Sequence, residues 1–356
     1  WRRWGNDYLT PASRLQSVID AVRGEAYLPV ELGACKCLLD DGGVWWTYAD
    51  FVREAASMAT PLRSRRGRLA FLSVANDKAS AAALLAAWSA GLAVALLDPA
   101  LDARAYDRLL SSFRPEIAFR PDVGFTATEY SSDRPAGGAP MWRGANICLS
   151  TSGTTGTTKF VRLSESGVLA NARQIAEVLH IEPDDVAVAH LPLHYSYGLS
   201  VLLSHLERGA AVFLTELKVT SPELNEKVTS AGGTHFPGVP FHYTVLARLG
   251  LDRMLPPCVR TFTQAGGHLD RRFRETVHQQ AMARGARFYV MYGQTEASPR
   301  MTTLASEIFA EKPDSVGRAM PGARIEIVDD DGAALPSGAI GQVVYYGRSE
   351  EHTSEL

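Results

Sequence analysis

The residues best suited to chemistry form a loop rich in glycine and hydroxyl groups at residues 149–159, Leu-Ser-Thr-Ser-Gly-Thr-Thr-Gly-Thr-Thr-Lys. Its glycines let the backbone turn N–H groups inward, the hydroxyls are neutral donors, and Lys159 adds one positive charge. We therefore predict a phosphate-binding loop with contacts from Thr151, Ser152, Gly153, Thr154, Thr155, Gly156 and Lys159. The alternative is a polar turn between two strands. The spacing differs from a Walker A loop, in which Lys directly follows the second glycine.

This loop resembles the T-S-G-[ST]-T-G-x-P-K-G motif of the acyl-adenylate-forming superfamily, which includes acyl-CoA synthetases, aryl-CoA ligases, luciferases and adenylation domains. It departs from the motif at Thr158, where the family usually has Pro, and at Phe160, where it usually has Gly. Further family motifs follow in the family's order: Gln-Ala-Gly-Gly at 264–267, Tyr-Gly-Gln-Thr-Glu at 292–296 and Asp-Ser-Val-Gly-Arg at 314–318. The resemblance covers about residues 46–347.

The resemblance implies a role for each motif. The ring of Tyr292 would pack on adenine, Thr295 would contact the α-phosphate, and Glu296 would hold Mg²⁺. The residues implied as catalytic are Thr295, Glu296, Lys159, His194 and Tyr195. The residues implied as further nucleotide contacts are Gln264, Ala265, Gly266, Gly267, Tyr292, Gly293, Gln294 and Thr295.

Residues 191–199, Leu-Pro-Leu-His-Tyr-Ser-Tyr-Gly-Leu, correspond to the region beside the reacting carboxylate in the family. Either His194 or Tyr195 occupies the family's histidine position, and a histidine that only packs at a turn is the alternative. Amino-acid-activating members carry an Asp nearby, and no Asp lies between Asp185 and Gly250. A buried ammonium without a partner is costly, so a fatty or aryl acid is favoured over an amino acid. Residues 236–240 are expected to contribute to the acyl pocket.

The order of apolar segments predicts an α/β fold. Strands at 69–74 and 92–97 alternate with helices at 79–90 and 101–113, which is typical of a parallel sheet covered on both faces. The family implies two packed αβα subdomains with mainly parallel sheets and the start of a small β-barrel-like subdomain. We place the subdomain boundary near 126–144 and the β-rich segment from about 317. In that segment, residues 324–329 and 342–346 are predicted to pair as antiparallel strands. Ser164 is expected to cap a helix at 164–179.

The bulk composition excludes several classes of protein. The net charge of −3 provides no field for nucleic acid or an anionic membrane, and no apolar segment is long enough to span a bilayer. The four cysteines match neither a zinc site nor a disulfide framework, so we predict a reducing compartment, the cytoplasm.

The last residues, 348–356, match one reading frame of a common short-read sequencing adapter, so we expect that they are not native. The AMP-binding N-terminal domain is then expected at 1–347. The family's ribose-binding T-G-D segment and its C-terminal domain with a catalytic Lys have no counterpart in this sequence, so we expect weak adenylation at best.

The predicted function is therefore that of part of an ATP-dependent, AMP-forming ligase. Its parent would activate a small carboxylic acid with ATP and Mg²⁺, then transfer the acyl group to coenzyme A or to the phosphopantetheine of an acyl carrier protein. Two other interpretations remain. One is a non-catalytic remnant of the same fold that binds a nucleotide or a partner. The other is a phosphotransferase that releases ADP, which the missing Walker A and kinase motifs disfavour.

Overall fold

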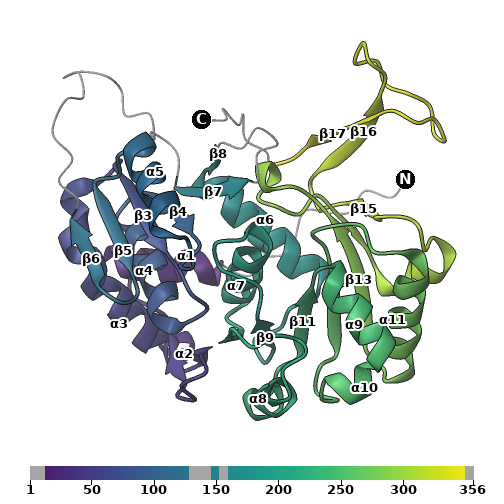
Figure 1. Ribbon diagram of the computed structural model, residues 1–356, viewed down its shortest axis with the longest axis horizontal. Coiled ribbons are helices and arrows are strands. Elements are labelled where there is room, and N and C mark those ends of the chain that lie inside the picture. Colours follow the sequence, from purple (N-terminus) through teal and green to yellow (C-terminus); the bar gives the residue numbers. More distant parts are fainter. Residues whose placement is uncertain (1–12, 128–145, 152–158, 349–356) are drawn as a thin grey trace.

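The computed structural model describes residues 13–127, 146–151 and 159–348, which form two large sheets and one ribbon (Figure 1). The six-stranded sheet has the order β6-β5-β3-β4-β7-β8, and its four central strands are parallel. Its strands are β3 (Leu69–Ser73), β4 (Ala93–Leu97), β5 (Ile117–Arg120), β6 (Gly124–Ala127), β7 (Ile147–Thr151) and β8 (Lys159–Leu163). β3 and β4 are buried along their whole length, as continuous apolar runs predict for parallel strands covered on both faces.

The nine-stranded sheet has the order β15-β14-β13-β12-β11-β9-β10-β1-β2. The strands from β13 to β1 are parallel, and antiparallel pairs close both edges. The strands are β1 (Lys36–Leu39), β2 (Trp46–Thr47), β9 (Val186–Ala189), β10 (Ala211–Leu214), β11 (His235–Gly238), β12 (Thr261–Gln264), β13 (Arg287–Tyr292), β14 (Thr302–Leu304) and β15 (Arg318–Ala319).

One apolar core joins the inner faces of the two sheets. It contains residues from both, such as Leu96 of β4 and Val212 of β10, and from the helices between them. Those helices are α1 (Arg14–Arg23), α3 (Tyr48–Ala59), α4 (Lys78–Ser89), α6 (Glu165–Val178) and α7 (Ser196–Arg208). The Ala-rich α4 is buried on nearly every side, because small side chains allow close packing between neighbours.

Two further cores cover the outer faces. The outer core of the six-stranded sheet packs under α5 (Ala103–Phe113). The outer core of the nine-stranded sheet lies under α8 (Glu223–Ala231), α9 (Pro240–Leu249), α10 (Leu251–Met254) and α11 (Arg271–Ala283). The fold therefore has alternating helix and sheet layers, which confirms the predicted α/β architecture.

Several predicted elements are confirmed with small changes in their bounds. Ser164 caps α6 by accepting a hydrogen bond from the Gly167 N–H at 3.2 Å. α7 begins at Ser196, so Tyr195 is its N-cap. β8 was not predicted. It forms because its Phe160 and Val161 side chains are both buried against the sheet.

The change of sheet does not fall where the sequence placed it. Strands on both sides of the connection at 126–144 belong to the six-stranded sheet, and residues 126–127 are part of β6; residues 128–145 lie outside the described residues. The chain passes between the sheets after β2 and again after β8. The polar composition of that connection indicated a surface loop, which does not distinguish a crossing within one sheet from a boundary.

The predicted antiparallel pair is confirmed as β16 (Arg324–Val328) and β17 (Gln342–Tyr346), a ribbon that projects from the body (Figure 1). Between residue 317 and this ribbon, β15 pairs with β14 at the edge of the nine-stranded sheet. In the described part of the chain, no helix is both long and apolar enough to cross a membrane.

Candidate nucleotide and acid site

A pocket of about 250 Å³ lies where three segments of the chain meet. The first follows β12, the second follows β13, and the third is the start of α7. The lining residues are Tyr195, Ser196, Tyr197, Ala265, Gly266, Tyr292, Gly293, Gln294, Thr295, Pro299 and Arg300. Because β12 and β13 are adjacent parallel strands, both loops leave the same edge of the sheet, which is where ligands bind in open α/β folds.

The segment after β13 turns back on itself. The Met301 N–H donates to the Tyr292 carbonyl at 2.9 Å, which closes the loop at its base. A Cβ at Gly293 would overlap the Pro299 carbonyl oxygen, so only glycine fits there. Tyr292 is 40% exposed, which leaves its ring face available for stacking. Thr295 lies within the loop, at the start of the 3-10 helix η2 (Thr295–Ala297), and donates from Oγ1 to the Ser196 hydroxyl at 3.2 Å.

The segment after β12 brings backbone close to a tyrosine. The buried Gln264 donates from Nε2 to the Gly267 carbonyl at 2.9 Å, which shapes the turn at 264–267. Gly266 has a φ of 77°, and a Cβ there would lie 2.5 Å from the Tyr195 hydroxyl oxygen. Glycine at this position therefore permits both the left-handed backbone and the contact with Tyr195.

The first turn of α7 forms the third wall. Its N–H groups at Ser196, Tyr197 and Gly198 have no carbonyl four residues earlier inside the helix, as in any first helical turn. They leave partial positive charge beside the pocket. A Cβ at Gly198 would overlap the Pro192 carbonyl, so the close approach of this turn to residues 191–192 also requires glycine.

The two candidates for the family's histidine position lie in different environments. Tyr195 lines the pocket, and burial raises the pKa of its hydroxyl, which remains a donor. His194 is absent from the pocket lining and lies 3.9 Å from an Asp98 oxygen. Burial lowers the pKa of His194, while Asp98 opposes this shift. The geometry thus brings Tyr195 to the site and directs His194 toward the six-stranded sheet.

The glycine-rich loop connects β7 to β8, and its residues Ser152, Gly153, Thr154, Thr155 and Gly156 lie outside the described residues. The two ends of the loop are described: Thr151 and Lys159 are paired across the hairpin. β8 also contacts η2, so the hairpin brings these ends to the elements that carry Thr295 and Glu296.

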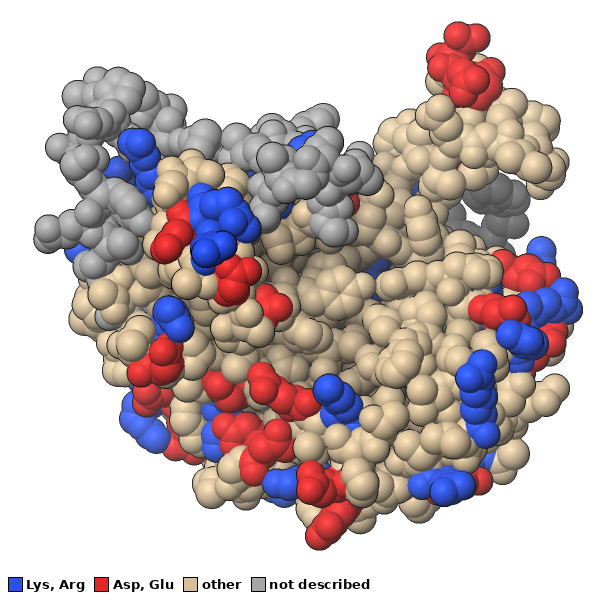
Figure 2. Space-filling model, viewed as in Figure 1, with Lys and Arg blue, Asp and Glu red and all other residues tan. Residues whose placement is uncertain are grey.

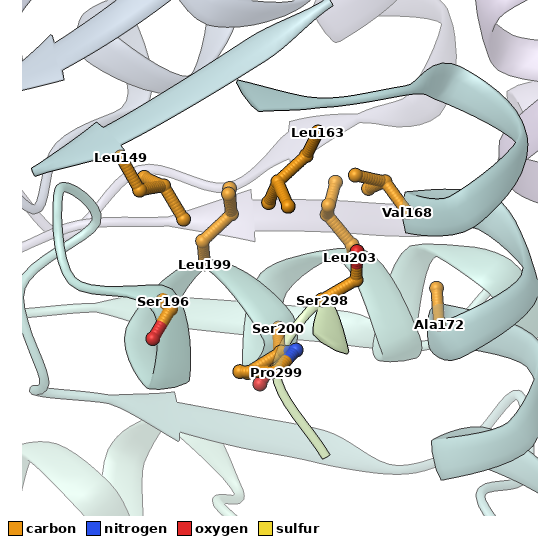
Figure 3. A pocket seen from close by; sticks show the side chains of 10 residues that line it. All are labelled: Leu149, Leu163, Val168, Ala172, Ser196, Leu199, Ser200, Leu203, Ser298 and Pro299. Atoms are coloured by element: carbon orange, nitrogen blue, oxygen red, sulfur yellow. The ribbon is translucent and has the colours of Figure 1, made fainter. Parts of the chain in front are cut away.

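A small apolar seam fixes the hairpin on the rest of the site (Figure 3). Leu149 and Leu163 of the hairpin face Leu199 and Leu203 of α7 across a space of about 10 Å³. The seam shares Ser196 and Pro299 with the larger pocket. A volume of this size holds about one water molecule, so the hairpin and α7 are close to full contact.

The departure from the family motif at Phe160 has a structural explanation. Its side chain is fully buried on the outer face of the six-stranded sheet. Its ring meets Phe113 edge-on at 4.9 Å and lies 6.1 Å from Phe71. Phe160 therefore anchors β8 immediately after Lys159, and the large side chain points away from α7 and the seam.

Glu296 could hold a metal ion. Its carboxylate is half-buried on η2 and has no ion pair or hydrogen bond with any described residue. Within the described residues, no group of three or more His, Cys, Asp or Glu side chains could bind a metal by itself. One free carboxylate fits Mg²⁺, which commonly binds through one or two carboxylates together with substrate phosphates.

Sequence reasoning missed four lining residues: Ser196, Tyr197, Pro299 and Arg300. Arg300 had a detectable signal, because a charged residue in the segment Ala-Ser-Pro-Arg-Met-Thr precedes a buried strand. The other predicted residues at 264–267 and 292–295 line the pocket or shape its walls. Residues 236–240 are not among its lining residues, although Val239 and Pro240 lie beside Gly266 and Gly267.

The surface view agrees with a site of low net charge. Figure 2 shows a hollow between the two halves of the molecule, lined mainly by uncharged residues. Acidic and basic side chains are mixed over the rest of this face (Figure 2), so any recognition of phosphate depends on local donors.

The family model for AMP-binding enzymes matches residues 145–350, more than half of the chain, and the chain belongs to this family. Among curated proteins, it is 30% identical over 210 residues to 4-coumarate–CoA ligase 5 of Oryza sativa subsp. japonica, covering 56% of this chain and 38% of that protein. It is 29% identical over 206 residues to 2-succinylbenzoate–CoA ligase of Bacillus cereus (strain AH820), covering 58% and 41%. The chain thus spans about two fifths of these relatives.

Solved structures share the fold. VinN matches with a TM-score of 0.76 and 22% identity, covering 98% of this chain and 89% of that chain. The N-terminal domain of FACL13 from Mycobacterium tuberculosis matches with a TM-score of 0.77 and 17% identity, covering 95% and 89%. At these identities the likeness supports the architecture alone.

Proposed function

We propose that this chain is the N-terminal part of an ATP-dependent, AMP-forming acid–thiol ligase that activates a carboxylic acid as its acyl-adenylate. One observation carries the proposal: Tyr292, Thr295, Gly266 and the first turn of α7, which are distant in sequence, line one pocket beside a free carboxylate, Glu296. The CoA ligases among the relatives support the same class of reaction.

In the proposed reaction, the acid carboxylate attacks the α-phosphorus of ATP, forms a P–O bond and releases pyrophosphate. Negative charge on the phosphate oxygens has to be neutralised as the carboxylate approaches. The Thr295 hydroxyl, the N–H groups of the α7 first turn and Lys159 supply donors and positive charge. Mg²⁺ held by Glu296 would neutralise phosphate charge. Tyr292 offers its exposed ring to adenine.

The pocket favours an acid without an α-amino group. No Asp or Glu is among the described residues that line it, so a substrate ammonium would lack a counter-ion. The aromatic rings of Tyr195 and Tyr197 and the methyl group of Ala265 provide apolar surface. A fatty or aryl acid fits this chemistry better than an amino acid. The product would pass to a thiol, either of coenzyme A or of a carrier-protein pantetheine.

Titration calorimetry of the full chain with ATP and Mg²⁺ tests the proposal. We expect binding that weakens by about 10-fold in Tyr292→Ala, because stacking on an aromatic ring is lost. The exposed Tyr27, which is 99% exposed and does not line the pocket, gives the matched control Tyr27→Ala. Equal ATP affinity in all three proteins would contradict the proposed site.

Product analysis then separates the alternatives. AMP and pyrophosphate from an acid-dependent reaction support the ligase, and ADP would instead support a phosphotransferase. Tight, Tyr292-dependent nucleotide binding without turnover, even when the missing part of the relatives' length is supplied, would identify a non-catalytic member of the family.

A further inference from the structure

Arg300 is a buried cation on the wall of the pocket. It is only 2% exposed, yet it is among the lining residues. Its guanidinium lies over the Tyr197 ring, 4.5 Å from the centroid. Asn171 of α6 holds its backbone on both sides: Asn171 Nδ2 donates to the Arg300 carbonyl at 2.8 Å, and the Arg300 N–H donates to Asn171 Oδ1 at 3.4 Å. The backbone of Arg300 is therefore held by an uncharged side chain.

The guanidinium lacks the partners that a buried arginine normally has. Its only hydrogen bond within the described residues runs from Nη1 to the Met291 sulfur at 3.0 Å, and Nε has none. No described carboxylate forms an ion pair with it. Arg260, in contrast, pairs with Asp185 at 2.6 Å. Burial accordingly lowers the pKa of Arg300, and only the hydroxyls of neighbouring tyrosines oppose the shift.

The ring of Tyr197 compensates for part of the lost hydration, because a cation over an aromatic face is attracted by its quadrupole. It does not satisfy the N–H donors, which lie in one plane and match the two oxygens of a carboxylate. An arginine that is buried, has no charged partner among the described residues and belongs to the lining of a ligand pocket has the properties of a recognition group awaiting an anion.

We propose that Arg300 is a specificity-determining residue that binds a second carboxylate on the acid substrate, so that the preferred acid is a dicarboxylic acid. This inference rests on the proposed ligase function and narrows its substrate class. It is compatible with an aryl or alkyl skeleton, since the rest of the lining is aromatic or small.

The reacting carboxylate is the less suitable partner for Arg300. A tight ion pair with the attacking oxygens would lower their nucleophilicity. The reacting group also loses its negative charge when it becomes the acyl-adenylate, which would leave Arg300 buried and unpaired again. A second carboxylate stays ionised through both half-reactions and keeps the guanidinium paired throughout.

Matched acids test the proposal by calorimetry on the full chain in the presence of saturating AMP. Each pair replaces one carboxylate by a methyl group: succinate against butyrate, glutarate against pentanoate, and terephthalate against p-toluate. We expect at least one diacid to bind about 10-fold or more tightly than its partner, as for a charge-assisted hydrogen-bonded pair. The variant Arg300→Met should remove that preference and bind both acids equally, while Arg300→Lys should restore part of it.

A half-buried arginine outside the pocket provides the control. Arg284 also has an unpaired Nε and lies over an aromatic ring, that of Phe262, but it does not line the pocket. Arg284→Met should therefore leave the diacid preference unchanged, and thermal melting of both variants shows whether a change in stability accompanies the change in preference.

The outcomes separate this inference from the ligase function. A diacid preference that disappears in Arg300→Met but persists in Arg284→Met supports the role of Arg300. Equal binding of every pair by the unmodified chain, absence of acid binding, or a preference that survives in Arg300→Met overturns it. AMP affinity, measured on the same proteins, reports on the nucleotide site independently: normal AMP binding without a diacid preference would contradict only the present inference.

Discussion

Thr295 donates a hydrogen bond from Oγ1 to the Ser196 hydroxyl at 3.2 Å, and this bond joins the loop after β13 to the first turn of α7. The two residues belong to different walls of the pocket. Their contact therefore sets the spacing between the donors that we assign to the phosphate.

Replacing Thr295 by Val keeps the shape of the side chain and removes its hydroxyl. We expect ATP affinity to fall by about 5-fold, because the hydroxyl that would turn from Ser196 to the phosphate is lost, a contribution of about 1 kcal/mol. Calorimetry with ATP and Mg²⁺ measures this. Thr229→Val, on α8, removes a hydroxyl that donates to the Asn225 carbonyl and should leave the affinity unchanged. An affinity unaffected by Thr295→Val would remove this residue from the site.

Gly266→Ala should destabilise the chain for two reasons. A residue with a side chain is strained at a φ of 77°, by about 1–2 kcal/mol, and its Cβ would also meet the Tyr195 hydroxyl at 2.5 Å. Urea unfolding measures the total decrease in the free energy of unfolding.

Gly285→Ala measures the cost in stability of the left-handed backbone alone. Gly285 has a φ of 69°, and a Cβ added there would have nothing within 4 Å. The double variant Gly266→Ala/Tyr195→Phe removes the clash and should recover about 1 kcal/mol or more of the loss. Equal losses in Gly266→Ala and Gly285→Ala would show that the contact with Tyr195 is not tight.

The effect of Mg²⁺ on ATP affinity should depend on the carboxylate of Glu296. Glu296→Gln preserves size and removes the charge, so the increase in ATP affinity on adding Mg²⁺ should shrink by about 10-fold, while affinity without Mg²⁺ stays the same or rises slightly. Calorimetry with and without the ion measures both values. The exposed Glu311 provides the control variant Glu311→Gln. A full Mg²⁺ effect in Glu296→Gln would place the ion elsewhere.

The stability of the chain should fall in mild acid because of buried histidine. Burial lowers the pKa of His205 from 6.5 to about 4, and burial also lowers the pKa of His235, whose ring lies 5.0 Å away. Asp185 has the opposite influence on His205. The pKa of His205 is lower in the folded chain than in the unfolded chain, so between pH 6.5 and 4 the unfolded chain binds more protons. Stability is therefore lost as the pH falls from 6.5 toward 4.

The expected loss from His205 is about 2 kcal/mol between pH 7.5 and pH 5. Urea unfolding at both pH values should show a smaller loss in His205→Gln than in the unmodified chain. His180→Asn alters an exposed histidine and should retain the full pH dependence. Identical pH dependence in all three proteins would contradict the assignment.

The layered fold could be predicted because its cause is local: continuous apolar strands and capped helices appear in the sequence itself. The position at which the chain passes from one sheet to the other could not be predicted. It depends on the pairing of β7 with β4, and these two strands are far apart in sequence. The walls of the pocket were predicted where glycines and hydroxyls form motifs. The sequence signals only that a charged residue precedes a buried strand at Arg300; that its Nε lacks a partner and that it lines the pocket are evident only from the three-dimensional arrangement.

The seam between the β7–β8 hairpin and α7 has a mechanical consequence. Thr151 and Lys159 are carried by one sheet, while Tyr292 and Thr295 are carried by the other. The candidate site therefore lies where the two sheets meet, and the apolar core that the sheets share holds its two halves together. Because the seam has room for about one water molecule, the alignment of the two halves depends on the packing of leucine side chains that are not among the residues lining the larger pocket.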